Sequence, residues 1–336
     1  MHTFIIAEAG VNHNGSLELA KKLIEAAAEA KADAVKFQTF NAKKLVSVNA
    51  PKAEYQKQTT DSKESQLDMI AKLQLSEQDH YILQEYANEK GILFLSSAFD
   101  EESADFLEKL GMPVYKIPSG EITNLRLLKK IAGYHKDVIL SCGMSTLDEI
   151  QRAYTTLVEH GAKSVSILHC NTQYPTPFKD VNLRSMDYLR EHFDCKIGYS
   201  DHTLGIEIPL AAVAMGAEVI EKHFTLDTTM EGPDHKASLD PEQLKAMVSG
   251  IRNIEMALGT KKKEVSESEA ANRLIARKSL VAARNISKGE VFTEENLTMK
   301  RPGNGIGCEY YDDLLGKVAK REYEADALID FEEMEN

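Results

Sequence analysis

Eight short apolar runs, each ending in a polar and chemically capable residue, constrain the fold of this chain more than any other feature. The runs are FIIAEAG from Phe4, ADAVKFQTF from Ala32, ILFLSSAF from Ile92, PVYKIPSGE from Pro113, VILSCG from Val138, SVSILHCN from Ser164, CKIGYSDH from Cys195 and EVIEKHF from Glu218. Stretches with helical spacing of apolar residues lie between them, so strand and helix alternate. This alternation predicts a (β/α)8 barrel, a TIM-barrel fold of the α/β class, in residues 1–258.

In such a barrel the active site lies at the carboxyl ends of the strands. Here those ends supply carboxylates, ammonium groups, hydroxyls, amides and imidazoles: Glu8, Lys36, Gln38, Ser97, Lys116, Ser119, Glu121, Ser141, Asn171, Ser200, His202 and His223. A barrel that served only as a scaffold would have no reason to place such groups at one rim. The pattern therefore predicts an enzyme.

The rest of the chain is organised around this barrel. Helices are expected near residues 17–31, 78–90, 101–110, 124–133, 146–160, 183–193, 206–216 and 241–258. The connection 41–77 is long and polar, as lids and binding loops are, and one helix is expected near residues 66–74. A charged linker, 259–275, then leads to short strands and turns in residues 276–336. We expect these to form a small domain that leans on the barrel or on another subunit.

The composition disfavours several classes of partner. A net charge of −13 argues against nucleic acid or an anionic membrane as the main partner. No apolar run reaches the roughly 18 residues of a membrane helix, and no signal peptide precedes the first strand. The four cysteines show no CxxC spacing, which favours buried thiols over disulfides or zinc. We therefore expect a cytoplasmic protein.

Two histidines at neighbouring strand ends indicate metal chemistry. His202 follows the seventh predicted strand and His223 ends the eighth, so both imidazoles can reach one point. Such a pair suits a divalent ion such as Mn, Fe, Co or Zn, with positions left open for water and substrate. Asp234 and His235 in GPDH are candidates for further ligands or for partners of the ligands. Either histidine alone would more simply be a hydrogen-bonded residue beneath a loop.

A second group of strand-end residues suits a phosphate ester. An ammonium group and several hydroxyls converge with no obvious excess of carboxylates: Lys116, Ser119, Ser97, Ser141 and Ser200. Lys36 and Gln38 add a charge and an amide. Lys36 and Lys116 lie inside apolar runs, where a lysine is costly unless it is paired. Each serine, taken alone, could equally be a turn or cap residue.

Glu8 and Glu121 are the candidate acids or bases. Either could hydrogen-bond the hydroxyls of a polyol or move a proton. Glu121 could instead lie in the first turn of a helix, where the helix dipole alone favours a carboxylate. Glu8 has no such simple explanation, because it lies inside an otherwise apolar strand.

Together these motifs resemble the bacterial sialic-acid (nonulosonate) synthase family. The matching elements are IAEAGVNHNG, VKFQTF, YKIPSGE, ILSCGM, HCNTQYPTP, GYSDHT, EKHFTLD, GPDH and KRPGNG, in order over nearly the whole chain. The resemblance implies a (β/α)8 barrel followed by a small antifreeze-like (SAF-type) domain. It also implies condensation of phosphoenolpyruvate with an N-acylated mannosamine-type aldose, which releases phosphate and a nine-carbon 2-keto acid. The implied assembly is a homodimer in which each small domain reaches over the partner's barrel.

The resemblance also implies a role for each matching residue. His202 and His223 would hold manganese or a similar divalent ion, with Mg, Co and Fe as alternatives. The implied phosphoenolpyruvate contacts are Lys116, Ser119, Ser141 and Ser200, with Ser97 standing where a threonine is common. The implied sugar- or intermediate-facing residues are Glu8, Lys36, Gln38, Tyr174 and Asp234, with Arg301 of the small domain extending toward the acyl group. Among the catalytic candidates Glu8, Lys36 and Glu121, we expect Glu121 to carry the proton at the water step.

The identity of the sugar stays open at this point. Thr172 and Phe37 depart from some family members near the sugar. N-acetylmannosamine, giving N-acetylneuraminate, is the first expectation; 2,4-diacetamido-2,4,6-trideoxymannose, giving N,N'-diacetyllegionaminate, is a nearly equal alternative. Pseudaminate-type sugars are a more distant option. A phosphorylated aldose would need a second phosphate site, for which no surplus basic cluster exists. A non-enzymatic carbohydrate-binding or ice-binding protein would not need the paired histidines.

Overall fold

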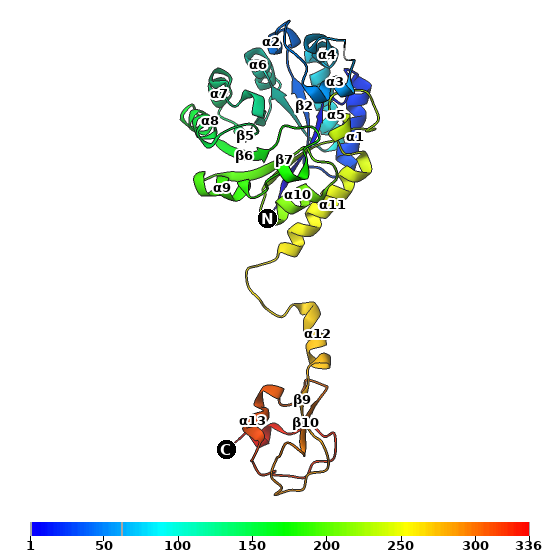
Figure 1. Cartoon of the computed structure of the whole chain (residues 1–336), viewed down its shortest axis with the longest axis vertical. Helices are drawn as coiled ribbons and strands as arrows, with labels where there is room; N and C mark the ends of the chain where they lie inside the picture. The colour runs from blue at the N-terminus through cyan, green and yellow to red at the C-terminus, as the bar shows by residue number, and fades with distance from the viewer. Residues whose placement is uncertain (1, 62, 336) are drawn as a thin grey trace. The chain divides into compact units, whose positions relative to one another are not determined.

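The barrel predicted from the alternation of strands and helices is present. The computed structural model describes residues 2–61 and 63–335, and the chain divides into two compact units between Gly259 and Thr260. In the first unit, parallel strands close into a barrel in chain order (Figure 1). The strands are β1 (Phe4–Gly10), β2 (Ala34–Thr39), β3 (Leu93–Ala98), β4 (Val114–Ile117), β5 (Asp137–Ser141), β6 (Ser164–Cys170), β7 (Lys196–Asp201) and β8 (Val219–His223).

Helices surround the barrel, and each lies within a few residues of its predicted range. They are α1 (Leu17–Glu29), α5 (Glu77–Lys90), α6 (Glu101–Lys109), α7 (Leu125–Ala132), α8 (Leu147–Glu159), α9 (Ser185–His192), α10 (Glu207–Ala214) and α11 (Pro241–Leu258). Capping side chains fix the starts of these helices except α9 and α10. Ser16 caps α1, since its Oγ accepts a hydrogen bond from the amide of Leu19 at 3.3 Å.

The long connection after β2 contains more helix than the sequence indicated. One helix was expected near residues 66–74, whereas the structure has α2 (Ala42–Leu45), α3 (Glu54–Thr59) and α4 (Gln66–Lys72). The first two are too short to show helical periodicity, so the apolar pattern could not reveal them. Short 3₁₀ helices occupy three further loops: η1 (Ser119–Glu121), η2 (Phe178–Asp180) and η3 (His235–Ala237).

Strand pairing brings the polar strand ends to one level. Because successive side chains of a strand alternate between the barrel interior and the helical layer, only every second residue can face the interior. Glu8 of β1 pairs with Lys36 of β2 on one side and with His223 of β8 on the other. Ser97 of β3 in turn pairs with Lys116 of β4. Polar side chains from several strands therefore meet above the apolar barrel core.

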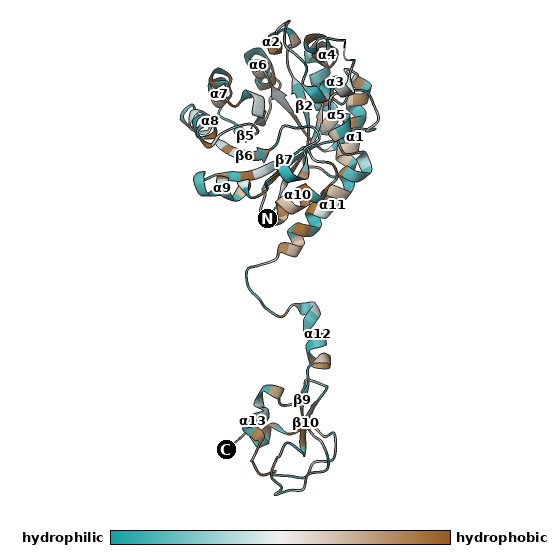
Figure 2. Cartoon of the chain, viewed as in Figure 1, coloured by the Kyte–Doolittle hydropathy of each residue, from teal (hydrophilic) through white to brown (hydrophobic). Residues whose placement is uncertain are grey.

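The second unit has a small core of its own. It contains α12 (Glu267–Ala276), β9 (Ser279–Ala282), β10 (Leu297–Lys300), η4 (Cys308–Tyr310), α13 (Tyr311–Leu314) and η5 (Phe331–Met334). β9 and β10 are antiparallel, and Phe292 and Tyr323 are among the residues buried around them. Figure 2 shows hydrophilic residues through most of α12 and apolar residues at its end, where Leu274 and Ile275 are exposed. Among the described residues, no helix combines the length and apolarity needed to cross a membrane.

Candidate active site

A cavity of about 510 Å³ lies at the carboxyl ends of the barrel strands. Its lining includes most of the residues selected from the sequence: Glu8, Lys36, Gln38, Ser97, Lys116, Ser119, Ser141, Tyr174, Ser200, His202, His223 and Asp234. Every barrel strand contributes to the lining at or near its end, with Cys170 from β6, and Tyr174 and Asp234 come from loops. The barrel therefore gathers at one place residues that are separated by more than 200 positions in the sequence.

Two lysines and two glutamates form a buried chain of ion pairs on the floor of this cavity. Lys36 Nζ lies 2.5 Å from Glu8 Oε2 and 3.7 Å from Glu221 Oε2. Lys116 Nζ donates a hydrogen bond to Glu221 Oε1 at 3.0 Å. All four side chains are at most 5% exposed. The floor therefore holds as many carboxylates as ammonium groups, and each lysine is already paired with a glutamate.

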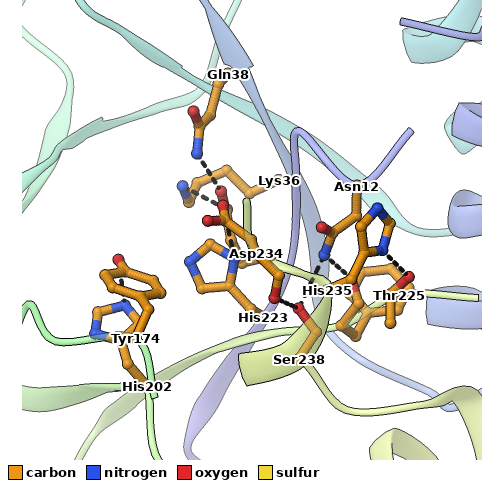
Figure 3. A network of polar contacts seen from close by, with 12 residues as sticks. Asn12, Lys36, Gln38, Tyr174, His202, His223, Thr225, Asp234, His235 and Ser238 are labelled. Carbon is orange, nitrogen blue, oxygen red and sulfur yellow. Dashed lines mark hydrogen bonds and ion pairs between the residues drawn. The ribbon is translucent and has the colours of Figure 1, made fainter. Parts of the chain in front are cut away.

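Neutral side chains complete the floor around the ion pairs. Gln38 Nε2 donates to Glu8 Oε1 at 3.1 Å, so Gln38 and Lys36 bind the same carboxylate. Figure 3 shows the side chains of Gln38 and Lys36. Ser200 Oγ donates to Glu221 Oε1 at 2.8 Å, and Lys36 Nζ donates to Ser97 Oγ at 3.1 Å. The serine hydroxyls thus lie within the same network as the ammonium groups.

The charges on the floor hold one another in place. Burial alone would raise the pKa of Glu221, but the charges of Lys116 and Lys36 and the hydrogen bonds from Lys116 and Ser200 outweigh burial and hold it well below its usual range. Burial alone would lower the pKa of Lys36, but the charges of Glu221 and Glu8 outweigh it and raise that pKa. Burial, helped by the charge of Glu221, raises the pKa of Glu8. Glu8 is therefore the floor carboxylate that takes up a proton more readily.

Two hydroxyls near β4 and β5 are suited to an anionic ligand. Ser119 Oγ accepts from the amide of Gly143 at 2.9 Å and lies 3.1 Å from Cys170 Sγ. Ser141 Oγ is buried, lines the cavity, and has no hydrogen-bond partner within the described part of the chain. A buried hydroxyl without a partner is uncommon in folded proteins, and it retains a donor for a bound oxygen atom.

The two histidines lie together, as expected. Their ring centroids are 5.4 Å apart, and Tyr174 covers His202 at a centroid distance of 4.1 Å (Figure 3). His202 Nδ1 donates to the carbonyl of Asn171 at 2.5 Å, so Nε2 carries the lone pair; it lies 2.9 Å from the Tyr174 hydroxyl. The unpartnered, buried Nδ1 of His223 lies 3.8 Å from Asp234 Oδ2.

Both imidazoles are neutral at physiological pH. Burial lowers the pKa of His202 to about 4. Burial, together with the nearby charge that His202 would carry if protonated, holds the pKa of His223 well below its usual value. Burial and the charge of Glu8 raise the pKa of Asp234 to about 7. Neutral imidazoles with available lone pairs are the form in which histidine binds a metal ion.

The protein side chains do not by themselves build a complete metal site. Over residues 2–61 and 63–335, no group of three or more His, Cys, Asp or Glu side chains is arranged to hold a metal ion. His202 and His223 nevertheless fit a divalent ion that takes its other ligands from water and substrate, because both are neutral and one has an unpartnered nitrogen. The histidine at η3, His235, is occupied elsewhere, since Nδ1 lies 2.7 Å from Thr225 Oγ1 and Nε2 lies 3.2 Å from Asn14 Oδ1.

One expected site residue of the barrel, Glu121, is outside the described lining of the cavity. Glu121 ends η1, where its carboxylate accepts a hydrogen bond from Asn124 Nδ2 at 2.8 Å. Of η1, Ser119 and Gly120 line the cavity in the described structure and Glu121 does not. Its assignment as the proton carrier therefore stays a prediction from the sequence. Arg301 belongs to the second unit, where its Nε donates to the carbonyl of Ala276 at 2.9 Å.

Glu221 is the site residue that the sequence analysis missed. It lies in VIEKH, two positions before His223, and so faces the barrel interior together with that histidine. The signal that could have identified it is the one that singled out Glu8, namely an acidic residue inside an apolar strand.

Fold and site together define a (β/α)8-barrel enzyme with an appended small domain. The model of the NeuB family matches residues 23–263, and the model of the SAF domain matches residues 277–333. The N,N'-diacetyllegionaminic acid synthase of Campylobacter jejuni is 56% identical over 97% of this chain and 98% of its own length. That of Legionella pneumophila is 46% identical over 100% and 95%. The crystal structure of an N-acetylneuraminic acid synthetase from Leptospira borgpetersenii, in complex with citrate, has a TM-score of 0.73 and 37% identity, over 81% of this chain and 90% of that one.

This chain belongs to the NeuB family, the nonulosonate (sialic-acid-type) synthases, and it is an enzyme. The family expectation formed from the strand-end motifs is thereby confirmed, as is the barrel with its SAF domain.

Proposed function

We propose that this chain condenses phosphoenolpyruvate with 2,4-diacetamido-2,4,6-trideoxymannose to give N,N'-diacetyllegionaminate and phosphate. From the sequence alone, N-acetylmannosamine was the first expected sugar substrate, and 2,4-diacetamido-2,4,6-trideoxymannose was the nearly equal alternative. The relatives at 56% and 46% identity are both named N,N'-diacetyllegionaminic acid synthases, and they favour the second sugar. The observation that carries the reaction class is the buried floor on which lysines and an unpartnered serine hydroxyl meet a pair of neutral histidines.

The floor supports binding of one phosphate ester rather than two. The lysines in the lining are Lys36 and Lys116, and the described lining contains no arginine. Lys116 and the hydroxyls of Ser119, Ser141 and Ser200 form one group of donors for the phosphate of phosphoenolpyruvate. Lys36 lies between the carboxylates of Glu8 and Glu221, so the described lining offers no further cationic group for a second phosphate, and the cavity favours an unphosphorylated sugar over an aldose phosphate.

The chemical step joins carbon 3 of phosphoenolpyruvate to the aldehyde carbon of the open-chain sugar. Water adds to carbon 2, and the resulting tetrahedral centre loses phosphate when its carbon–oxygen bond breaks. The attacking water loses both of its protons: one is gained by the sugar oxygen, and the other leaves with the phosphate when the hydroxyl at carbon 2 becomes the ketone. We assign the protein's part in this transfer to Glu8, because it lines the cavity and has a raised pKa. Lys116 and the serines hold the phosphate while the bond breaks.

A divalent ion, manganese by the family resemblance, would be held by His202 and His223. When bound, it would polarise the aldehyde oxygen of the sugar. The charges of the floor support its presence. Two lysines face the carboxylates of Glu8 and Glu221 and the partly ionised Asp234, so a further anionic substrate needs another positive charge.

The reaction is tested by phosphate release from phosphoenolpyruvate with manganese and each candidate sugar. We expect turnover with 2,4-diacetamido-2,4,6-trideoxymannose and a nine-carbon keto acid as the product in mass spectrometry. Absence of phosphate release with every N-acylated mannose sugar would contradict the proposal. Faster turnover of N-acetylmannosamine would keep the reaction and replace the sugar.

The metal assignment is tested by binding as well as by activity. We expect His223→Ala to lose manganese binding in calorimetry and to lose turnover, while its circular dichroism spectrum stays that of the wild type. The matched control is His192→Ala at the exposed end of α9, which should bind manganese normally. Unchanged manganese affinity in the His223→Ala variant would remove the assignment.

A further inference from the structure

The cavity has one polar and one apolar side, and the apolar side is assigned no role by the reaction itself. The polar floor comes from the strand ends described above. The apolar side, here called the apolar wall, consists of Val11, Phe40, Leu45, Met69, Ile70, Leu73 and Phe99. Most of it comes from residues 40–73, the connection that carries α2, α3 and α4. This segment is therefore part of the binding site.

The connection turns its charges away from the cavity. Residues 41–77 are rich in lysine and acidic side chains, yet their described contribution to the lining is Leu45, Ala53, Gln56, Gln66, Met69, Ile70 and Leu73, none of them charged. The charged groups pair among themselves instead. Glu64 lies 3.9 Å from Lys52 Nζ and 3.1 Å from Lys72 Nζ. The described residues of the connection thus line the cavity with alkyl, thioether and amide groups and with no charged group.

The wall is held in place before any ligand binds. Val11, Phe40 and Leu73 are buried in a cluster separate from the barrel core, with Leu45, Ile70 and Phe99 packed against it. Phe40 and Phe99 meet edge to face, with ring centroids 6.1 Å apart and an interplanar angle of 87°. The Met69 sulfur accepts a hydrogen bond from Thr60 Oγ1 at 3.6 Å. A preformed apolar surface binds an apolar group without having to be ordered first.

The wall lies opposite the phosphate side of the barrel. The phosphate donors come from β4, β5 and β7, whereas the wall follows β1, β2 and β3. In a closed barrel of eight strands β5 and β7 lie across the lumen from β1 and β3, while β4 borders β3. A sugar whose aldehyde carbon approaches phosphoenolpyruvate near the centre must extend its far end toward the wall.

We propose that the apolar wall binds the carbon 6 methyl group of a 6-deoxy sugar and so selects 6-deoxy sugars over those with a carbon 6 hydroxyl. This inference rests on the proposed condensation reaction. A hydroxyl at carbon 6 that packed against the apolar wall would lose its hydrogen bonds to water, because none of the wall side chains carries an N–H group, an O–H group or an oxygen atom. Ile70 is the central residue for this selection, because it lines the cavity while remaining partly accessible.

The direct test compares two sugars that differ only at carbon 6. For the wild-type enzyme we expect kcat/KM to be about 10- to 100-fold higher with 2,4-diacetamido-2,4,6-trideoxymannose than with its 6-hydroxy counterpart. Equal kcat/KM for the two sugars would overturn the wall assignment and leave the condensation reaction standing. No phosphate release with either sugar would instead remove the proposed function on which the inference rests.

A substitution then assigns the selection to the wall. Ile70→Thr keeps the branched shape and adds a hydroxyl, so we expect about a tenfold fall in kcat/KM for the 6-deoxy sugar, mostly through KM. The kcat/KM for the 6-hydroxy sugar should change less than about twofold, so the ratio of kcat/KM between the 6-deoxy and 6-hydroxy sugars falls. Val48→Thr is the matched control, since Val48 lies in the same connection, is 77% exposed and is not in the described lining. An unchanged preference in Ile70→Thr, or an equal shift in Val48→Thr, would overturn the inference.

Discussion

Glu221 is a buried carboxylate shared by two ammonium groups, and its surroundings explain why it is needed. Lys36 and Lys116 are each almost completely buried, and an unpaired ammonium there would be costly. Glu221 contacts both, at 3.7 and 3.0 Å, and also accepts from Ser200. It keeps the cations charged and in place, while competing with a bound phosphate for Lys116.

The substitution Glu221→Gln separates the stabilisation of the two lysines from the competition with phosphate for Lys116. The amide keeps the shape but leaves Lys36 with Glu8 as its remaining described carboxylate partner and Lys116 with none, so we expect the free energy of unfolding to fall by about 3–5 kcal/mol. Phosphate should then bind more tightly than in the wild type, because Lys116 is no longer neutralised. Urea unfolding with and without phosphate measures both. The control Glu218→Gln, at the start of the same strand run and outside the described lining, should change stability by less than about 0.5 kcal/mol.

At the scale of single residues, the sequence predicted the types of group at the site better than their partners. Glu8, Lys36 and Lys116 were identified because a charged side chain inside an apolar strand needs a partner. Which partner each one has depends on pairing between strands far apart in the chain, and a single sequence does not show that register. For Glu121 the sequence motif was recognisable, but the motif does not show which way the side chain points. The structure shows that its carboxylate accepts a hydrogen bond from Asn124.

At the scale of elements, β7 and β8 are joined on their outer side as well as through the cavity. Lys222 and Asp201 form a fully buried ion pair of 2.5 Å between the two strands. Lys222 Nζ also donates to the carbonyl of Thr203 at 2.5 Å, and Asp201 accepts from the amide and hydroxyl of Thr203. These bonds hold Asp201 and Thr203, the residues on either side of His202. The ion pair of Lys222 and Asp201 therefore positions that histidine from the outer side of the barrel wall.

Asp201→Asn tests this positioning role. The substitution leaves Lys222 buried without its counter-charge, and we expect the free energy of unfolding to fall by about 3–5 kcal/mol. Manganese affinity should fall as well, because the segment around His202 loses its anchor. The exposed pair of Asp187 and Arg190 provides a control, and Asp187→Asn should cost less than about 1 kcal/mol and leave manganese affinity unchanged. Wild-type affinity in Asp201→Asn would show that the pair is structural alone.

The loop between β1 and α1 gives the barrel a sensitivity to acid. Burial lowers the pKa of His13 to about 4, below the value of about 6.5 for an exposed histidine. Below pH 6.5 the unfolded chain therefore binds a proton that the folded chain does not, and stability falls until the pH reaches about 4. At the acid end of this range the free energy of unfolding has fallen by about 3 kcal/mol.

His13→Asn should remove most of this acid sensitivity. Asparagine keeps an oxygen that can accept from the amide of Gly15, as Nδ1 of His13 does at 3.0 Å, and it does not titrate. Urea midpoints at pH 7 and pH 4.5 should therefore lie closer together in the variant than in the wild type. An equal separation of the midpoints would show that other groups, such as His80 with its lowered pKa, account for the acid loss.

Most barrel helices, such as α7 and α8, carry apolar residues at helical spacing, which a sequence shows directly, and they were predicted within a few residues. In α5 and α10 this spacing is weak, and the alternation of strands and helices predicted them instead. By contrast α2 and α3 are formed by caps and packing within residues 41–77, where Asn41 caps α2. The apolar wall was likewise out of reach, because its residues gather only when these short helices fold against β1 and β3.

At the scale of the whole molecule, the chain pairs a large barrel with a second unit of modest core. That core includes Leu280, Phe292, Tyr323 and Ile329. A domain of about 60 residues buries a limited fraction of its surface and gains stability from contact with another body. By the family resemblance, we propose that this body is the barrel of a partner subunit and that Arg301 reaches the partner's sugar. Arg301 is exposed, and Nε of its guanidinium bonds to Ala276, which leaves further N–H donors for a ligand.

Arg301→Ala should raise the KM for the sugar and leave the KM for phosphoenolpyruvate nearly unchanged, because the arginine is assigned to the acyl group alone.

Mixing the Arg301→Ala and His223→Ala variants then shows which barrel Arg301 serves. The His223→Ala variant has an inactive barrel and an intact Arg301. The Arg301→Ala variant has an intact barrel and lacks the arginine. If each small domain serves its partner, mixed dimers contain one site with a complete set of residues. At random exchange about a quarter of all sites would be complete, and activity with the wild-type sugar KM should reappear. If each small domain serves its own barrel, mixing restores nothing beyond the sum of the two variants.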